Sequence, residues 1–574
     1  MNTKLRKYKN MFLYRLGIVL GFLLVFGKTY AGIKIAVITD THVMAPELLI
    51  NDGTAWQNYL ASDRKLIDYS RPLLDAVLNK IENEIRPDAV LVTGDLTKDG
   101  EVLSHQYIWA RLAQLVDKGI KVSVVSGNHD FGTGNAKYYD GDNATSAAVL
   151  SKNEFPSMYA DCGYKGSLRD PNSLSYCREL FPGLVILGID SGKDGVISSS
   201  SLTWIENQAK TNYQKGKQVI AIMHHPLVPH FQGGETFMPV SYINDYENVR
   251  NRLADAGVRM ILTGHFHTSD IATDFNADLS KSIIDINTGS LVTYPCNYRV
   301  LEFSDDLQSV NVSTGSITSI EGVDNFPTVA KERLKTAVKT LVNSMGSAYS
   351  TMASTISQAF IYHAEGNENQ SSGAQSTLST LLSAANVARM LGVIEERKIQ
   401  AMELLGTSML KNTCNYGISG RQTITNDLSL PITLNPTSET ITIGNSGWAT
   451  FTSGRYLDFG SVPGLEAFIA TGSDASSVNL ESIGIVPPMT GIVLRGTEGT
   501  YTVNVTDGIP GDVSRNKLSA NLLGTIPAAG SYVLSKKNGI VGFYKLSSGI
   551  SIPGKKAYIS NTNSNGAKTR IVIR

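Results

Sequence analysis

The sequence predicts an α/β domain, followed by an α-helical segment and an all-β domain that is a sandwich or a barrel. Between residues 33 and 312, short β-branched runs alternate with amphipathic stretches, as in α/β domains. Apolar residues then recur at helical spacing. From about residue 423, Thr, Ser, Val, Ile and Gly dominate, and turn clusters separate alternating segments. A chain of 574 residues is also too long for one hydrophobic core.

The α/β domain has six strand candidates, each short, as buried strands are. They are Ile33–Thr39, Ala89–Thr93, Lys121–Ser126, Leu184–Ile189, Val219–Met223 and Met260–Thr263. The amphipathic stretches between them would form helices that cover the sheet layers. We expect this domain to span residues 32–315.

Helical spacing begins after Asn325-Phe326-Pro327. The apolar positions there are Leu334, Val338, Leu341, Val342 and Met345, and residues 378–410 repeat the pattern. We expect a helical hairpin or small bundle over residues 326–412, interrupted by a polar stretch at 366–375, within a segment bounded by 316 and 422. Residues 423–574 would form the all-β domain, with strict alternation in Thr500–Val505.

The N-terminus has the layout of a secretory signal peptide over residues 1–31. Basic residues precede the apolar run Leu16–Phe26, and the small residue Ala31 suits cleavage. This run is shorter than the roughly 20 residues of a spanning helix. No later segment is long and apolar enough to span a bilayer, so we expect an exported protein that is periplasmic, cell-surface or secreted.

Charge and cysteines restrict the function classes. The first 31 residues hold six Lys and Arg and no acid, so the rest of the chain is acidic despite a formal net charge of zero. Nothing suggests a nucleic-acid partner, which usually requires a concentrated basic face. Four cysteines follow the signal peptide, without metal-binding spacing. Proximity favours a disulfide between Cys162 and Cys177, although three connectivities are open.

Five polar clusters each follow a predicted strand directly. They are Asp40-Thr41-His42, Gly94-Asp95, Gly127-Asn128-His129-Asp130, His224-His225-Pro226 and Gly264-His265-Phe266-His267. In open α/β sheets the ligand crevice lies at the carboxyl ends of the strands, so the clusters should converge. Any one of them alone could cap a helix or sit in a solvated loop. Together they hold six of the nine histidines of the chain.

Such a set suits the hydrolysis of a phosphoester. Two metal ions about 3.5 to 4 Å apart can supply a nucleophile near neutral pH and neutralise charge on the departing oxygen. A carboxylate must bridge ions held so close, while imidazoles and oxygen ligands complete each shell. A mixed oxygen and nitrogen set indicates Mn, Fe, Zn or similar divalent ions.

The clusters resemble those of the calcineurin-like metallophosphoesterase family, which includes purple acid phosphatases and a class of cyclic-nucleotide phosphodiesterases. All five occur in the family's order across residues 33–305. The resemblance implies a four-layer α/β/β/α sandwich with a dinuclear centre. It implies that Asp40, His42 and His267 bind one metal, that Asn128, His224 and His265 bind the other, and that Asp95 bridges them.

The resemblance also implies the reaction. A metal-bound hydroxide would attack a phosphomonoester or phosphodiester, and the catalytic residues would be His129 and Asp130. His129 would donate a proton to the leaving oxygen or stabilise the transition state. Asp130 would orient that imidazole or a neighbouring turn. In the His-His-Pro block, His225 could replace His224 as the ligand.

Substrate choice is left open by the sequence, beyond a small-molecule phosphoester. Residues 131–164 are expected to form one wall of the cleft. The long loop 43–70 carries Arg64 and Lys65, which either bind a phosphate oxygen or are surface charges. His230 is a further candidate substrate contact. The alternative function is a surface binding or adhesion protein in which the β module has the main role.

Overall fold

The computed structural model describes residues 32–573, with gaps at 229, 231–241, 278–279, 345–349, 351, nearly all of 367–428, and short stretches of the C-terminal region (435–436, 475–476, 507, 522–526, 528–529, 548–549 and 561–568). The predicted signal peptide, the apolar pattern at 378–410 and Cys414 lie outside the described residues. Within the described part, no helix is both long and apolar enough to cross a membrane.

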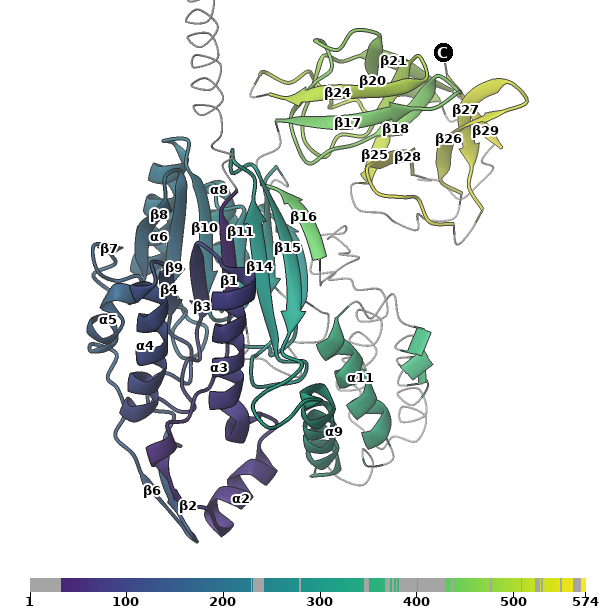
Figure 1. Cartoon of the computed structure of the whole chain (residues 1–574). Coiled ribbons are helices and arrows are strands. Elements are labelled where there is room, and N and C mark those ends of the chain that lie inside the picture. The colour runs from purple at the N-terminus through teal and green to yellow at the C-terminus, as the bar shows by residue number, and fades with distance from the viewer. Residues whose placement is uncertain are drawn as a thin grey trace, which may run out of the picture.

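Two sheets form the N-terminal half of the protein (Figure 1). The first has the strand order β16-β15-β14-β1-β3-β4 and the second β12-β13-β11-β10-β9-β8-β7. The first comprises β1 (Lys34–Ile38), β3 (Ala89–Thr93), β4 (Lys121–Val125), β14 (Asn297–Phe303), β15 (Ser309–Ser316) and β16 (Ser429–Thr433). The second comprises β7 (Leu168–Arg169), β8 (Tyr176–Phe181), β9 (Leu184–Ile189), β10 (Gln218–Met223), β11 (Met260–Thr263), β12 (Asp270–Phe275) and β13 (Ser282–Asn287). All six strand predictions are confirmed.

Helices cover the outer faces of the sheets, so the central strands β3, β9 and β10 are buried on both faces, whereas every second residue at the start of β15 is exposed. The period-2 geometry of a strand divides the side chains of β10 between two cores. Ile220 and Ile222 face the core shared with the first sheet, α3 (Ser70–Lys80) and α4 (Val102–Asp117). Val219, Ala221 and Met223 face the second core, which also takes in apolar side chains of α6 (Ser199–Tyr213) and α8 (Tyr246–Asp255). The four-layer α/β/β/α sandwich is therefore confirmed.

Two described helices follow the sandwich, α9 (Phe326–Ser344) and α11 (Ala353–Glu365). The buried stripe of α9 repeats every fourth residue and consists of Phe326, Ala330, Leu334, Val338 and Val342. Leu341, from the same predicted pattern, is 60% exposed. Because the stripe joins the core of the first sheet, α9 and α11 pack against the sandwich.

β16, the first strand of the segment 423–574, belongs to the first sheet of the sandwich and not to the all-β region. β16 pairs antiparallel with β15 and becomes the edge of the first sheet. Ile432 and Leu434 join the core of that sheet. Pro431 is compatible with this place, since proline in sheets is confined largely to edge strands.

The C-terminal region is all-β, as predicted. A four-stranded sheet contains β17 (Ser438–Ile443), β19 (Leu457–Asp458), β22 (Ile485–Val486) and β24 (Gly499–Val505). A nine-stranded sheet contains β18 (Trp448–Phe451), β20 (Leu465–Asp474), β21 (Ser477–Ser482), β23 (Ile492–Gly496), β25 (Leu518–Asn521), β26 (Tyr532–Lys537), β27 (Ile540–Lys545), β28 (Lys556–Ile559) and β29 (Arg570–Ile573). Its terminal strand β18 returns to β28, where Ala557 N donates to Thr450 Oγ1 (3.2 Å). The sheet therefore nearly closes into a barrel.

The cysteine prediction is wrong. Cys162, Cys177 and Cys296 are free and buried. Burial raises the pKa of the Cys162 thiol to about 12 and that of Cys177 to about 11. Cys162 packs in the core between the sheets and Cys177 in the other core, so their closeness in sequence does not bring the two sulfurs together.

Candidate metal centre

The five polar clusters meet at the carboxyl ends of β1, β3, β4, β10 and β11. Backbone hydrogen bonds join the loops, since Asp40 N donates to Gly94 O (3.0 Å) and His42 N to Asp95 O (3.0 Å). Gly264 N donates to His224 O (3.0 Å) and so joins two loops of the second sheet. The site is thus built from both sheets of the sandwich.

Three glycines in these loops leave room for polar side chains that pack against their backbone. A Cβ on Gly94 would lie 2.6 Å from His224 Nδ1, and one on Gly127 would lie 2.2 Å from Asp95 Oδ1. A Cβ on Gly264 would lie 2.5 Å from Asp40 Oδ2. Each of these glycines is required by a polar side chain packed against its backbone.

The polar residues themselves adopt an unusual backbone conformation. Five of them have φ between 39° and 72°, the left-handed region that side chains other than glycine rarely adopt. They are Asp40, His42, Asp95, His265 and His267. Each such residue costs on the order of 1 to 3 kcal/mol, and such strain clusters at functional sites.

The first group consists of Asp40, His42 and His267, whose ligand atoms lie within 4.8 Å of one another. His267 Nε2 is 3.3 Å from both Asp40 Oδ1 and His42 Nε2. Thr293 Oγ1 contacts the other ring nitrogen of His267 at 2.8 Å and orients the ring. All three group members are buried.

The second group consists of Asn128, His224 and His265. Asn128 Oδ1 is 3.0 Å from both His224 Nε2 and His265 Nδ1. His224 Nδ1 donates to Thr93 O (2.9 Å), so Nε2 is the ring nitrogen that is directed at the group.

Asp95 lies between the two groups. Its Oδ2 is 3.5 Å from His42 Nε2 in the first group and 3.3 Å from His224 Nε2 in the second. Burial raises the pKa of Asp95, but the charges of His224 and His129 outweigh it and hold the pKa well below its usual range. Asp95 is thus an anionic side chain within reach of both groups.

These residues fit divalent cations. Asp40 Oδ1 is buried and has no hydrogen-bond partner among the described residues. His224 Nε2 lies 3.0 Å from Asn128 Oδ1 and 3.3 Å from Asp95 Oδ2, so a cation or a proton at this point would bind all three atoms. Nitrogen and oxygen donors in this mixture suit borderline divalent metals.

His129 lies beside both Asp95 and His42, and its side chain is 25% exposed. Its Nδ1 donates to Lys98 O (2.8 Å) and lies 3.1 Å from Asp99 Oδ1. Burial lowers the pKa of His129, but the Asp95 charge and the Asp99 hydrogen bond raise it above its ordinary value. The imidazole is therefore held in one orientation and favoured in its protonated form.

Asp99 is the residue that sequence reasoning missed. Its carboxylate accepts from Thr133 Oγ1 (2.6 Å) and from Lys98 Nζ (2.5 Å), in addition to its contact with His129. The Lys98 ammonium is buried, and it also lies 3.5 Å from Glu101 Oε1. The only sequence signal is its place four residues after Asp95, in the same loop.

Asp130 contacts backbone rather than the His129 ring. Its buried carboxylate accepts from the backbone N–H groups of Leu96 (3.2 Å), Thr97 (3.0 Å) and Gly127 (2.8 Å). Of the two roles expected for it, the structure shows the contacts that orient a neighbouring turn. Asp130 thereby ties the loop after β3 to the loop after β4.

The remaining histidines have separate surroundings. His225 lies outside both groups, with Nδ1 2.8 Å from Ser191 Oγ, so the structure places His224 and not His225 beside Asn128. His105 is buried and donates to Asp130 O (2.9 Å). His230 lies between two carboxylates, with Nε2 3.5 Å from Asp285 Oδ2 and Nδ1 3.7 Å from Asp270 Oδ1. His230 is thus a buried residue between two carboxylates, whereas the sequence made it a candidate substrate contact.

In the segment 131–164, which is expected from the sequence to form a wall of the cleft, several aromatic side chains are buried. Phe155 and Tyr159 are buried and pack against each other and against His105. Tyr139 packs on Trp56 of α2 (Thr54–Ser62), with ring centroids 5.0 Å apart. These aromatic side chains stabilise the loops rather than offering stacking surfaces.

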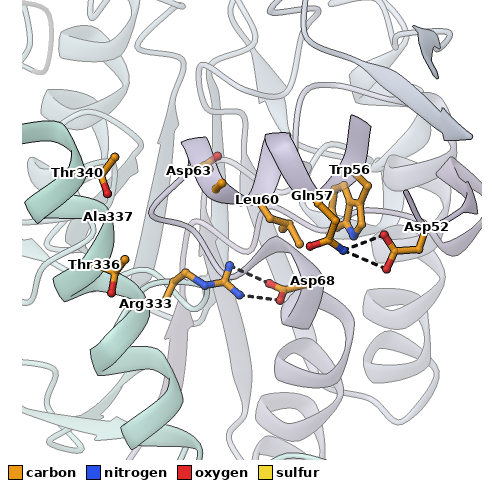
Figure 2. Close-up of a pocket in the computed structure, with 11 residues that line it drawn as sticks. Asp52, Trp56, Gln57, Leu60, Asp63, Asp68, Arg333, Thr336, Ala337 and Thr340 are labelled. Carbon is orange, nitrogen blue, oxygen red and sulfur yellow. Dashed lines mark hydrogen bonds and ion pairs between the residues drawn. The ribbon is translucent and has the colours of Figure 1, made fainter. Parts of the chain in front are cut away.

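A cavity of about 470 Å³ lies between α2 and α9. Figure 2 shows Arg333 of α9 directed at Asp68, with Nη2 2.8 Å from Oδ2. None of the metal-ligand candidates lines this cavity. Its ion pair instead connects the helical segment to the loop that carries Arg64 and Lys65.

The N-terminal half of the chain is similar to known phosphoesterases. The calcineurin-like phosphoesterase family model matches residues 33–269. A protein of Rhodococcus erythropolis named probable cyclic nucleotide phosphodiesterase is 26% identical over 216 residues, which cover 36% of this chain and 60% of that protein. One of Arcobacter nitrofigilis named probable glycerophosphodiester phosphodiesterase is 29% identical over 210 residues, covering 35% and 64%. The chain thus spans 60% and 64% of the length of these relatives.

Among solved structures, a dimetal phosphatase from Danio rerio covers 50% of this chain and 96% of its own, with a TM-score of 0.38 and 16% sequence identity.

Proposed function

Residues 33–269 form a calcineurin-like phosphoesterase domain, and on this premise we propose that the protein hydrolyses small-molecule phosphoesters at a centre of two divalent cations. The observation that carries the proposal is the position of Asp95. Its carboxylate lies 3.5 Å and 3.3 Å from imidazole nitrogens of two separate ligand groups. A shared carboxylate is what two closely spaced cations require.

The proposed ligands are divided between two ions. Asp40, His42 and His267 would hold one, and Asn128, His224 and His265 would hold the other, with Asp95 shared. Bound cations of this kind supply a nucleophile near neutral pH and neutralise charge that develops on phosphoryl oxygens. Mn, Fe and Zn suit these ligands, and two ions per chain is part of the proposal.

The proposed proton donor is His129. Because Nδ1 donates to Lys98 O, the second nitrogen, Nε2, is available to give a proton to the leaving oxygen. Asp99 stabilises the imidazolium and keeps the ring in place. Asp130 has an indirect role. It accepts a hydrogen bond from Gly127 N and so fixes the turn that carries Asn128 and His129.

A substrate panel tests the proposal. Protein reconstituted with Mn, Fe or Zn is assayed against aryl phosphomonoesters, aryl phosphodiesters, nucleotides and cyclic nucleotides. We expect turnover of at least one class that disappears when the metals are chelated and returns when they are added back. Absence of turnover with every metal and every class would contradict the proposal.

A further inference from the structure

Two adjacent cations, Arg64 and Lys65, lie in the loop between α2 and α3. Lys65 is only 9% exposed, so it is not the surface charge that the sequence allowed. Its ammonium lies 3.5 Å from Asp63 Oδ2. Asp63 also accepts from Tyr59 Oη (3.0 Å) and from the Lys65 backbone N–H (3.0 Å), so this carboxylate is shared among several donors.

Arg64 has a different environment. It is exposed, and within the described part of the chain its guanidinium makes no hydrogen bond or ion pair. Lys65 thus pairs with Asp63, whereas Arg64 has no ion-pair partner among the described residues.

Hydrogen bonds place this loop beside the proposed metal centre. Leu66 N donates to Val292 O (2.7 Å), which pairs the chain next to Lys65 with the segment 290–293. That segment contacts the first ligand group twice, through Ser290 Oγ to Asp40 O (3.0 Å) and through Thr293 Oγ1 to His267 Nδ1 (2.8 Å).

The loop is also held from its other end. Asp68, three residues after Lys65, pairs with Arg333 of α9 through the two terminal guanidinium nitrogens, with Nη2 at 2.8 Å and Nη1 at 3.3 Å (Figure 2). Positioning charges on a braced loop lowers the entropic cost of using them in binding. This contact also gives α9 a role in supporting the site.

We infer that Arg64 and Lys65 bind the additional unesterified oxygen of a phosphomonoester dianion, which makes monoesters the favoured substrate class of this centre. The inference rests on the proposed function. A monoester has one more unesterified oxygen and one more negative charge than a diester. In a diester, the second ester group occupies that place, and two cations offer it no charged partner.

Charge-removing variants measured on two substrates test this. Arg64→Gln, Lys65→Met and the double variant are compared with Lys210→Ala, which removes an exposed cation from α6. The substrates are para-nitrophenyl phosphate and bis(para-nitrophenyl) phosphate, with metal-reconstituted protein. Metal content is measured for every variant.

For each cation removed, we expect KM for the monoester to rise about tenfold, as for a lost hydrogen bond to a charged group. KM for the diester should change by less than about threefold, and the control should match the wild type. Calorimetry with inorganic phosphate should show the same weakening without turnover. Lys65→Arg should retain most of the monoester affinity.

Equal losses on both substrates, or no loss on either, would overturn the inference. Arg64 is exposed, so its variant decides the matter even if the Lys65 variants fail to fold. A wild type that hydrolyses neither substrate would contradict the proposed function instead, and phosphate calorimetry would then still decide whether these cations bind phosphate.

Discussion

Replacing Asp99 with Asn should separate proton donation from metal binding. Asn keeps the size of the side chain and removes the charge that faces His129 Nδ1 at 3.1 Å and Lys98 Nζ at 2.5 Å. General acid catalysis typically contributes a factor of about 10² to 10⁴. We therefore expect kcat to fall by about 10² or more, with a much smaller change in KM.

The same substitution leaves the Lys98 ammonium with less compensation. Lys98 is fully buried, and breaking a buried ion pair from one side costs about 3 to 5 kcal/mol. Glu101, 3.5 Å from Lys98, and the Asn135 carbonyl, 3.0 Å from it, offset part of this cost. We expect a loss of unfolding free energy of about 3 kcal/mol in chemical denaturation, near the lower end of that range.

Steady-state kinetics with an aryl phosphate, together with metal analysis, provides the assay. Thr133→Val is the matched control, because it removes a neutral hydrogen bond to Asp99 (2.6 Å) and leaves the charge in place. It should change kcat by less than about tenfold. If Asp99→Asn retained wild-type kcat while folded and fully loaded with metal, the role assigned to Asp99 and His129 would be refuted.

Four further substitutions test the packing at the site and elsewhere in the fold. In Gly264→Ala, the new Cβ would meet Asp40 Oδ2 at 2.5 Å, so bound metal should fall toward one ion per chain in elemental analysis; unchanged content would contradict the packing argument. Leu334→Ala should cost about 2 to 5 kcal/mol in chemical denaturation, whereas Leu341→Ala, at a 60% exposed position, should cost little. Burial lowers the pKa of His230, but Asp285 and Asp270 raise it to about 10 from an ordinary 6.5. Its stabilisation is therefore complete below about pH 6.5 and lost as pH rises through about 10. The wild type should be more stable than His230→Gln at pH 6, and a difference that grew toward pH 10 would refute this sign.

The fold of the N-terminal half could be predicted because its signals are local. Runs such as Ala89–Thr93 and Met260–Thr263 are short and apolar up to a final threonine, which is typical of strands covered on both faces. The convergence of the polar clusters followed from one rule, that ligand sites lie at the carboxyl ends of parallel strands. Those residues were therefore identifiable from their position relative to a strand.

The remaining features depend on contacts between distant segments. Asp99 is an ordinary loop acid in the sequence, and only the fold brings it against His129. Lys65 is buried because its loop pairs with residue 292. β16 joins a sheet more than a hundred residues before it in the chain, although its composition matches that of the strands that follow. No spacing rule within the sequence carries this information.

Metal stoichiometry tests the central claim most directly. Elemental analysis and stepwise metal titration are applied to the wild type and to Asp95→Asn, with turnover of an aryl phosphate followed in the same samples. We predict two equivalents in the wild type, activity that requires both, and the joint loss of metal and activity in the variant. Full turnover by Asp95→Asn, or a wild type that reaches full activity with a single equivalent, would contradict the account.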